Sequence, residues 1–186
     1  MGCSNPHPHR QIWAQSTVTN EIKKKTISQQ AYFKDKGKSL LSDYLDEEIA
    51  EKSRVVVEND RFVCPVPFWA IWPYGTMIIP KRPFQAISDM TNEDEQSFVS
   101  IIRDITIRYD NLFETSFPYS AGMQQSSTDD KNYKGWDFHY SFYPHVLKSA
   151  TVKKFMVGYE MFSIPQRDIT SENAATKIKI VTYCKL

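Results

Sequence analysis

Hydrophobic residues recur along the chain with two periods, and the longer period predicts helices. Over residues 39–52, leucine, tyrosine and isoleucine return every three or four positions, which predicts a helix capped by its first residue, a serine. A longer stripe follows Thr91, whose Thr-x-x-Asp pattern is typical of a capping box. The stripe consists of Phe98, Ile101, Ile102, Ile105, Tyr109 and Leu112. Another helix is expected over 168–179, capped by Thr170 or Ser171.

The shorter period, two residues, predicts β-strands. Two β-rich runs, 54–58 and 61–66, are separated by Asn-Asp, which is typical of a hairpin, and 76–79 is a third strand. Residues 136–143 alternate with aromatic side chains on one face, and 155–161 alternate in the same way. Strands that are interspersed with helices and joined by hairpins indicate an α+β domain with an antiparallel sheet.

Two polar segments are expected to lie outside these elements. The lysine-rich run 21–25 is interpreted as a solvated loop or arm, and residues 122–135 as a polar loop. The uncharged window 62–80 contains four prolines, which excludes a continuous membrane helix, so no membrane partner is expected.

Composition narrows the class of protein. The chain has 186 residues, with 23 Lys and Arg against 22 Asp and Glu, and this near-neutral balance excludes a general nucleic-acid binder. The three cysteines, Cys3, Cys64 and Cys184, are far apart, which favours a reducing compartment over a disulfide framework. We therefore expect a soluble, cytoplasmic protein.

Candidate chemistry lies near the start of the chain, in His7-Pro8-His9-Arg10-Gln11. In an extended segment the two histidines and Gln11 share a face. Neutral imidazole is a nucleophile near pH 7, and an amide can donate to a phosphate oxygen as charge develops. The same pattern suits metal ligation, or a solvated histidine pair without a role.

Two strands carry further polar side chains. His139 shares a face with Asp137 and Ser141, and is either a satisfied histidine at a sheet edge, a metal ligand or a phosphate contact. On the strand that follows, Lys154 and Glu160 lie on one face and suit a phosphate and a sugar hydroxyl, or simply a charged outer face.

Residues 2–13 closely resemble the active-site segment of the galactose-1-phosphate uridylyltransferases, a family of the histidine-triad superfamily. Further stretches match in order: 108–113, 116–120, 142–144, 149–161 and 166–168. The resemblance runs from residue 1 to about 175. It implies that 1–20 form the end of an N-terminal lobe that carries the His-Pro-His strand, and that 21–186 form a C-terminal histidine-triad-like domain.

The resemblance implies a uridylyl transfer between UDP-glucose and galactose 1-phosphate, in a homodimer. His9 is the expected nucleophile, Gln11 its catalytic partner, and His7 a zinc ligand. The remaining matched positions are expected to bind substrate. They are Ser4, Lys154, Phe155, Val157, Tyr159, Glu160 and Gln166.

The departures from the family are as specific as the matches. The family's first lobe, with the other zinc ligands, is absent, so we expect a truncated form that is inactive alone, and zinc only in the complete enzyme. The positions of the family's second metal site, a glutamate and three histidines, correspond to Lys25, Gln124, His139 and Ser141, so no iron site is expected. The alternatives are a non-catalytic or degenerate histidine-triad-like subunit, or nucleotidylyl transfer to another acceptor.

Overall fold

A five-stranded antiparallel sheet organises the computed structural model, which describes residues 17–70, 72–114, 116–117, 119–129, 131–144 and 169–181. The strands lie in the order β1-β2-β3-β5-β4. They are β1 (Val55–Glu58), β2 (Phe62–Pro65), β3 (Thr76–Pro80), β4 (Tyr119–Gln124) and β5 (His139–Pro144). The helices are α1 (Asn20–Lys36), α2 (Leu40–Glu51), the short 3₁₀ turn Ile87–Asp89, α3 (Asn92–Phe113) and α5 (Ser171–Ile180). The prediction of an α+β fold with an antiparallel sheet is confirmed.

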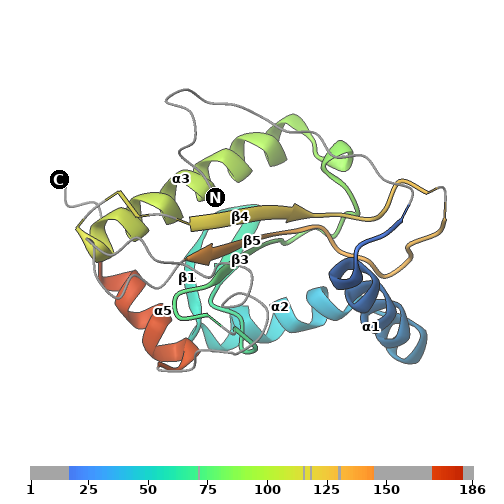
Figure 1. Cartoon of the computed structure of the whole chain (residues 1–186), viewed down its shortest axis with the longest axis horizontal. Coiled ribbons are helices and arrows are strands. Elements are labelled where there is room, and N and C mark those ends of the chain that lie inside the picture. Colours follow the sequence, from blue (N-terminus) through green and yellow to red (C-terminus); the bar gives the residue numbers. More distant parts are fainter. Residues whose placement is uncertain are drawn as a thin grey trace.

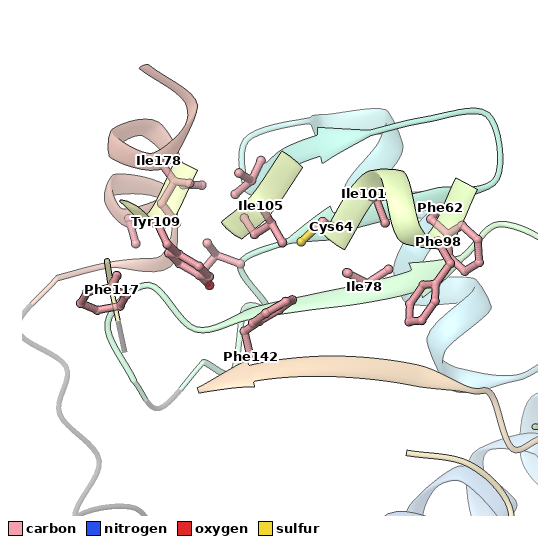
Figure 2. Close-up of a cluster of buried hydrophobic side chains, with 14 of the residues drawn as sticks. Phe62, Cys64, Ile78, Phe98, Ile101, Ile105, Tyr109, Phe117, Phe142 and Ile178 are labelled. Carbon is pink, nitrogen blue, oxygen red and sulfur yellow. The ribbon is translucent and has the colours of Figure 1, made fainter. Parts of the chain in front are cut away.

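Helices cover both faces of the sheet (Figure 1). On one face, α3 and α5 pack on the strands through the larger core (Figure 2). Its fully buried side chains include Phe62, Cys64, Ile78, Ile101, Ile105, Tyr109 and Ile178. On the other face, α2 buries Leu41 and Leu45 against Val63, Met77 and Ile79. Neighbouring residues of β2 and β3 thus enter opposite cores, as the two-residue period of a strand requires. None of the helices in the described part of the chain is long and apolar enough to cross a membrane.

The predicted helix starts are confirmed by their caps. The hydroxyl of Ser39 accepts the N–H of Ser42 at 3.2 Å at the start of α2. Thr91 and Asp94 form the predicted capping box of α3, with hydrogen bonds of 3.2 and 3.0 Å in the two directions. Of the two caps considered for the last helix, the structure has Thr170.

Four sequence predictions about α1 and the strands β4 and β5 are wrong. The run 21–25 is not a loop, because it lies inside α1. The loop predicted from residue 122 begins later, because Gly122–Gln124 belong to β4, whose six residues all pair with β5. Strand β5 begins at His139, whereas Trp136 precedes it and its ring lies 6.2 Å from the His139 ring. His139 is also not at a sheet edge, since β5 lies between β3 and β4.

Helix α1 could not be predicted because it has no strong apolar stripe and is held by contacts with residues about 100 positions away in the sequence. Its single buried residue is Gln29, whose side-chain oxygen accepts the N–H of Asp137 at 3.0 Å. Phe33 lies against Gly135, which has a φ of 85°, and a Cβ on that glycine would stand 2.5 Å from the Phe33 Cβ. Glycine is therefore required there on two grounds, the left-handed backbone and the close approach of α1.

Candidate functional site

A cavity of about 650 Å³ opens on the sheet face that carries α1 and α2. Its floor comes from β3, β4 and β5, and α1 forms one side. The opposite side is the segment 67–75 between β2 and β3, which we call the wall loop; its residue Ile71 is outside the described part. Trp69 and Trp72 bring aromatic surface to the cavity, and Lys24 and Lys25 bring positive charge. Cavities of this size with a mainly apolar lining and a few polar groups are typical of sites for small molecules.

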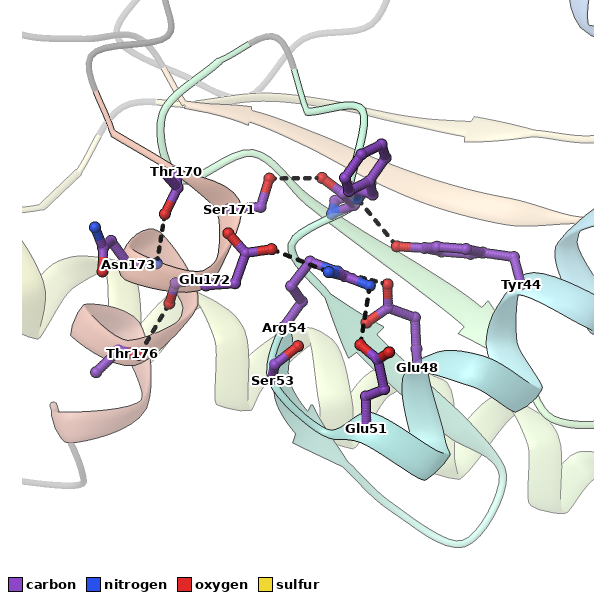
Figure 3. A network of polar contacts seen from close by, with 12 residues as sticks. Tyr44, Glu48, Glu51, Ser53, Arg54, Thr170, Ser171, Glu172, Asn173 and Thr176 are labelled. Carbon is purple, nitrogen blue, oxygen red and sulfur yellow. Dashed lines mark hydrogen bonds and ion pairs between the residues drawn. The ribbon is translucent and has the colours of Figure 1, made fainter.

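The wall loop is fixed by three hydroxyl groups from three helices. Tyr109 of α3 donates to the Tyr74 carbonyl at 2.7 Å, and Tyr44 of α2 accepts the N–H of Phe68 at 3.1 Å. Ser171 of α5 donates to the carbonyl of the first loop residue at 3.0 Å, as Figure 3 shows. Tyr74 itself has a φ of 63°, an uncommon value for a residue with a side chain, so the loop needs such restraints.

A polar cluster lies at the edge of the cavity, where α1 meets β4 and β5. Gln124 and His139 are directly opposite each other in the β4–β5 pair, with Gln124 Oε1 3.1 Å from His139 Nε2. Lys25 reaches across from α1. Its Nζ donates to Gln124 Oε1 and lies 3.2 Å from His139 Nε2. We call these three residues the Lys25 cluster.

The roles of the groups in the cluster follow from their outer hydrogen bonds. Nδ1 of His139 lies 3.0 Å from the Asp137 carbonyl oxygen, which can only accept, so Nδ1 carries the proton and Nε2 offers a lone pair. The Gln124 amide nitrogen donates to Tyr143 at 3.1 Å, which turns Oε1 towards the cluster. Two acceptors therefore face each other, and the Lys25 ammonium supplies the protons for both.

Burial shifts the pKa of the two titratable members in the direction that keeps His139 neutral. Burial lowers the pKa of His139 to about 3, and the positive charge of Lys25 adds to this. Burial also lowers the pKa of Lys25 to about 8, against the opposing effect of Glu21. At pH 7 the amine is still mostly protonated, so the cluster carries one positive charge, on Lys25.

Ser141, two residues after His139 on the same face of β5, lines the cavity next to the cluster. Its side-chain oxygen is buried and has no hydrogen-bond partner in the described part of the protein. The residue opposite it in β4 is Gly122, where an added Cβ would meet no atom within 4 Å. This pair leaves open space above the floor of the cavity.

The predicted site residues divide into two groups. Those near the start of the chain (Ser4, His7, His9 and Gln11) and those between residues 154 and 166 (Lys154, Phe155, Val157, Tyr159, Glu160 and Gln166) lie outside the described residues. Of the four positions matched to a metal site by resemblance, three are in direct contact and Ser141 lies beside them. Within the described residues, no three His, Cys, Asp or Glu side chains form a group that could hold a metal ion.

Reasoning from residue patterns alone missed the Lys25 cluster. Lys25 stood in a segment interpreted as a loop, and Gln124 in another, so nothing in their spacing brought them to His139, 114 and 15 residues away. Only the family resemblance put these positions together, because it carries information on long-range contacts that periodicity lacks.

Comparison with known proteins points to a single family. The family model described as "Galactose-1-phosphate uridyl transferase, C-terminal domain" matches residues 25–185. Proteins named galactose-1-phosphate uridylyltransferase from Haemophilus influenzae and Saccharomyces cerevisiae are 44% and 47% identical over 98% and 96% of this chain. The alignments cover 52% and 50% of those proteins. The chain thus spans about half the length of the curated relatives that it matches.

Solved structures agree on the fold. A structure titled "Structure of uridylyltransferase" superposes on 96% of this chain with a TM-score of 0.84 at 22% identity, and 56% of that protein is covered. An ADP-glucose phosphorylase from Arabidopsis thaliana with bound ADP-glucose matches over 90% of this chain, and 50% of its own, with a TM-score of 0.70 at 17% identity. The fold and the family model agree, and the chain belongs to the galactose-1-phosphate uridyl transferase family, of which it matches the C-terminal domain.

Proposed function

We propose that this chain takes part in uridylyl transfer between UDP-glucose and galactose 1-phosphate, as the C-terminal part of a UDP-glucose:hexose-1-phosphate uridylyltransferase. The observation that carries the proposal is the 44–47% identity, over nearly the whole chain, to relatives that bear this name. The cavity beside the Lys25 cluster supports it, because a volume of about 650 Å³ suits a nucleotide sugar.

The transfer proceeds in two displacements at phosphorus. A neutral ring nitrogen of His9 attacks the α-phosphorus of UDP-glucose, the bond to the bridging oxygen breaks, and glucose 1-phosphate leaves with that electron pair. The phosphate of galactose 1-phosphate then attacks the uridylyl-histidine, UDP-galactose forms, and the imidazole is released unchanged. Gln11 donates to a non-bridging oxygen while charge builds up on it.

The other assignments belong to the same proposal. Ser4 contacts phosphate oxygens, and the later group (Lys154, Phe155, Val157, Tyr159, Glu160 and Gln166) binds the hexose phosphate in a cytoplasmic homodimer. His7 is a zinc ligand whose partners come from the half of the enzyme that the alignments do not cover, since a structural zinc site needs four ligands. When bound, zinc stabilises the strand that carries the nucleophile.

The test uses UDP-glucose labelled in the uracil ring, with the chain alone and with the chain fused to the uncovered half of the Haemophilus influenzae relative. Samples are quenched in alkali, in which phosphohistidine survives, and the label is located by mass spectrometry. We expect close to one label per fusion protein, on His9, and none in the His9→Gln fusion. The chain alone should acquire none, because a nucleophile without its nucleotide pocket lacks positioning.

Each departure from this result has a definite meaning. Label that persists in the His9→Gln fusion shows that another residue is the nucleophile. A folded fusion that acquires no label supports the non-catalytic subunit instead. Label that is discharged by another sugar phosphate but not by galactose 1-phosphate identifies a different acceptor.

A further inference from the structure

We propose that the Lys25 ammonium is the built-in cation of the Lys25 cluster, occupying the position where the family resemblance implies a metal ion, so that this protein docks α1 on the sheet without metal. The proposal does not rest on the uridylyl transfer. It rests on the geometry and the donor chemistry of the described residues.

The residues of the cluster do not fit iron or another divalent metal. A metal site needs several lone-pair donors that converge on one point, with anionic or imidazole ligands among them. Here one of the four side chains is a cation, one is a neutral amide, and one is a hydroxyl. Nζ of Lys25 lies 3.2 Å from His139 Nε2 and also donates to Gln124 Oε1, so the lone pairs that a metal would use are already bound to ammonium protons.

The arrangement nevertheless requires a hydrogen-bond donor at this place. Gln124 Oε1 and His139 Nε2 are both acceptors, and they lie 3.1 Å apart. The outer hydrogen bonds to Tyr143 and Asp137 prevent either group from turning its donor inwards. Two acceptors at this distance repel each other unless a donor bonds to both, and here the Lys25 ammonium is that donor. Lys25 therefore links α1 to two neighbouring strands, as a metal ion shared by the same positions would do.

Because there is open space beside Ser141, the proposal can be tested by converting the Lys25 cluster into a metal site. The buried Ser141 oxygen has no partner among the described residues, and Gly122 opposite it leaves room for a larger side chain. Three substitutions, Lys25→Glu, Gln124→His and Ser141→His, would give a carboxylate and three imidazoles around one point, including the existing His139. That set suits a divalent transition metal.

The first experiment measures metal in the full-length chain. Wild type, His139→Ala, the triple variant and the triple variant with His139→Ala are stripped with chelator and titrated with Co²⁺, which is followed by its d–d absorption. We expect equal Co²⁺ stoichiometry in wild type and His139→Ala, and one further equivalent in the triple variant that disappears with His139→Ala. Any zinc site at His7 is common to all four proteins and cancels in the comparison.

Two results overturn the proposal: a wild-type protein that loses one equivalent of Co²⁺ on His139→Ala, or a folded triple variant that gains none.

A second experiment needs no engineered metal site. Lys25→Met should raise the amide hydrogen-exchange rates of α1 at least tenfold, whereas its neighbour Lys24→Met, which removes a side chain that is 75% exposed, should leave them unchanged. Wild-type exchange should be identical with and without EDTA. Equal effects of the two substitutions, or faster exchange in EDTA, would also refute the role of Lys25.

Discussion

Arg54 donates from Nε to Oε1 of Glu48 at 2.7 Å, and this carboxylate is completely buried (Figure 3). The guanidinium, 15% exposed, also reaches Glu172 of α5 at 3.0 Å and Glu51 of α2 at 3.6 Å. One side chain at the start of β1 thus joins helices from both faces of the sheet. Glu48 has no other cationic partner within 4 Å in the described part of the protein.

Removal of Arg54 is expected to be strongly destabilising. Arg54→Met leaves the Glu48 carboxylate buried without its counter-charge, which costs about 3–5 kcal/mol in such pairs. For a chain of this size, that loss lowers Tm by roughly 10 °C. Thermal unfolding followed by circular dichroism measures it. Glu51→Gln is the matched control, since Glu51 contacts the same guanidinium but is 64% exposed, and it should shift Tm by less than about 2 °C. Similar shifts for the two variants would contradict the dominance of the buried pair.

The hydrogen bonds around the Asp94 carboxylate predict that the protein loses stability in acid. Burial of this carboxyl favours the neutral form, but hydrogen bonds from Arg82 at 2.6 Å, the Thr91 N–H and Arg61 outweigh it and hold its pKa well below the usual range. A lowered pKa in the folded state means that stability is complete above the unfolded pKa, near 4, and falls as the pH drops towards the folded pKa.

Asp94→Asn tests this directly by urea unfolding between pH 7 and pH 2.5. The variant should be about 2–3 kcal/mol less stable at pH 7, since it loses charged hydrogen bonds and half of the capping box. The difference between the two proteins should shrink as the pH falls below 4. A difference that stays constant with pH would show that the Asp94 charge does not contribute.

The hydroxyl of Tyr109 should contribute measurably to the free energy of unfolding, although its ring lies in the apolar core. It donates to the Tyr74 carbonyl at 2.7 Å and lies 2.9 Å from the Thr76 hydroxyl. Tyr109→Phe leaves the Tyr74 carbonyl and the Thr76 hydroxyl without this partner and is expected to cost about 1–3 kcal/mol. Because Tyr74 belongs to the wall loop, Trp72 fluorescence should also change in the native state. Tyr133→Phe, which removes a hydroxyl bonded to Asp129, is the control for a simple loss of one hydrogen bond.

Cys64 is expected to be inert while the protein is folded. It is completely buried, and burial raises the pKa of its thiol to about 12, so its thiolate at pH 8 is rarer than that of a free cysteine by on the order of 10³. In a Cys3→Ser, Cys184→Ser variant, labelling by Ellman's reagent should follow global unfolding and be complete within seconds in 6 M guanidinium. Fast labelling of the folded variant would show that the large core opens locally.

Elements with an apolar stripe could be predicted from the sequence, and those held by other means could not. The stripe from Phe98 to Leu112 and the caps at Ser39 and Thr91 are local signals, and the structure agrees with each of them. Strand β4 contains serine, alanine and glycine, so its conformation is decided by pairing with β5 rather than by its own residues. Helix α1 is decided by contacts at a distance, such as that of Gln29 with Asp137.

The same distinction applies to the candidate site. The catalytic role of His9 remains a prediction from a short motif and a resemblance, whereas the Lys25 cluster is a property of the tertiary fold. Within the cluster, the residue pattern revealed only that His139 shares one face of a strand with Asp137 and Ser141. Its proton donor sits 114 residues earlier, on a helix that periodicity does not detect.

The three hydroxyl groups that hold the wall loop belong to helices on opposite sides of the sheet, Tyr44 on one side and Tyr109 and Ser171 on the other. The shape of the cavity is therefore a joint property of the two hydrophobic layers. Substitutions deep in either layer can change ligand affinity while the chain stays folded, and compensating changes are to be sought across the sheet rather than beside the cavity.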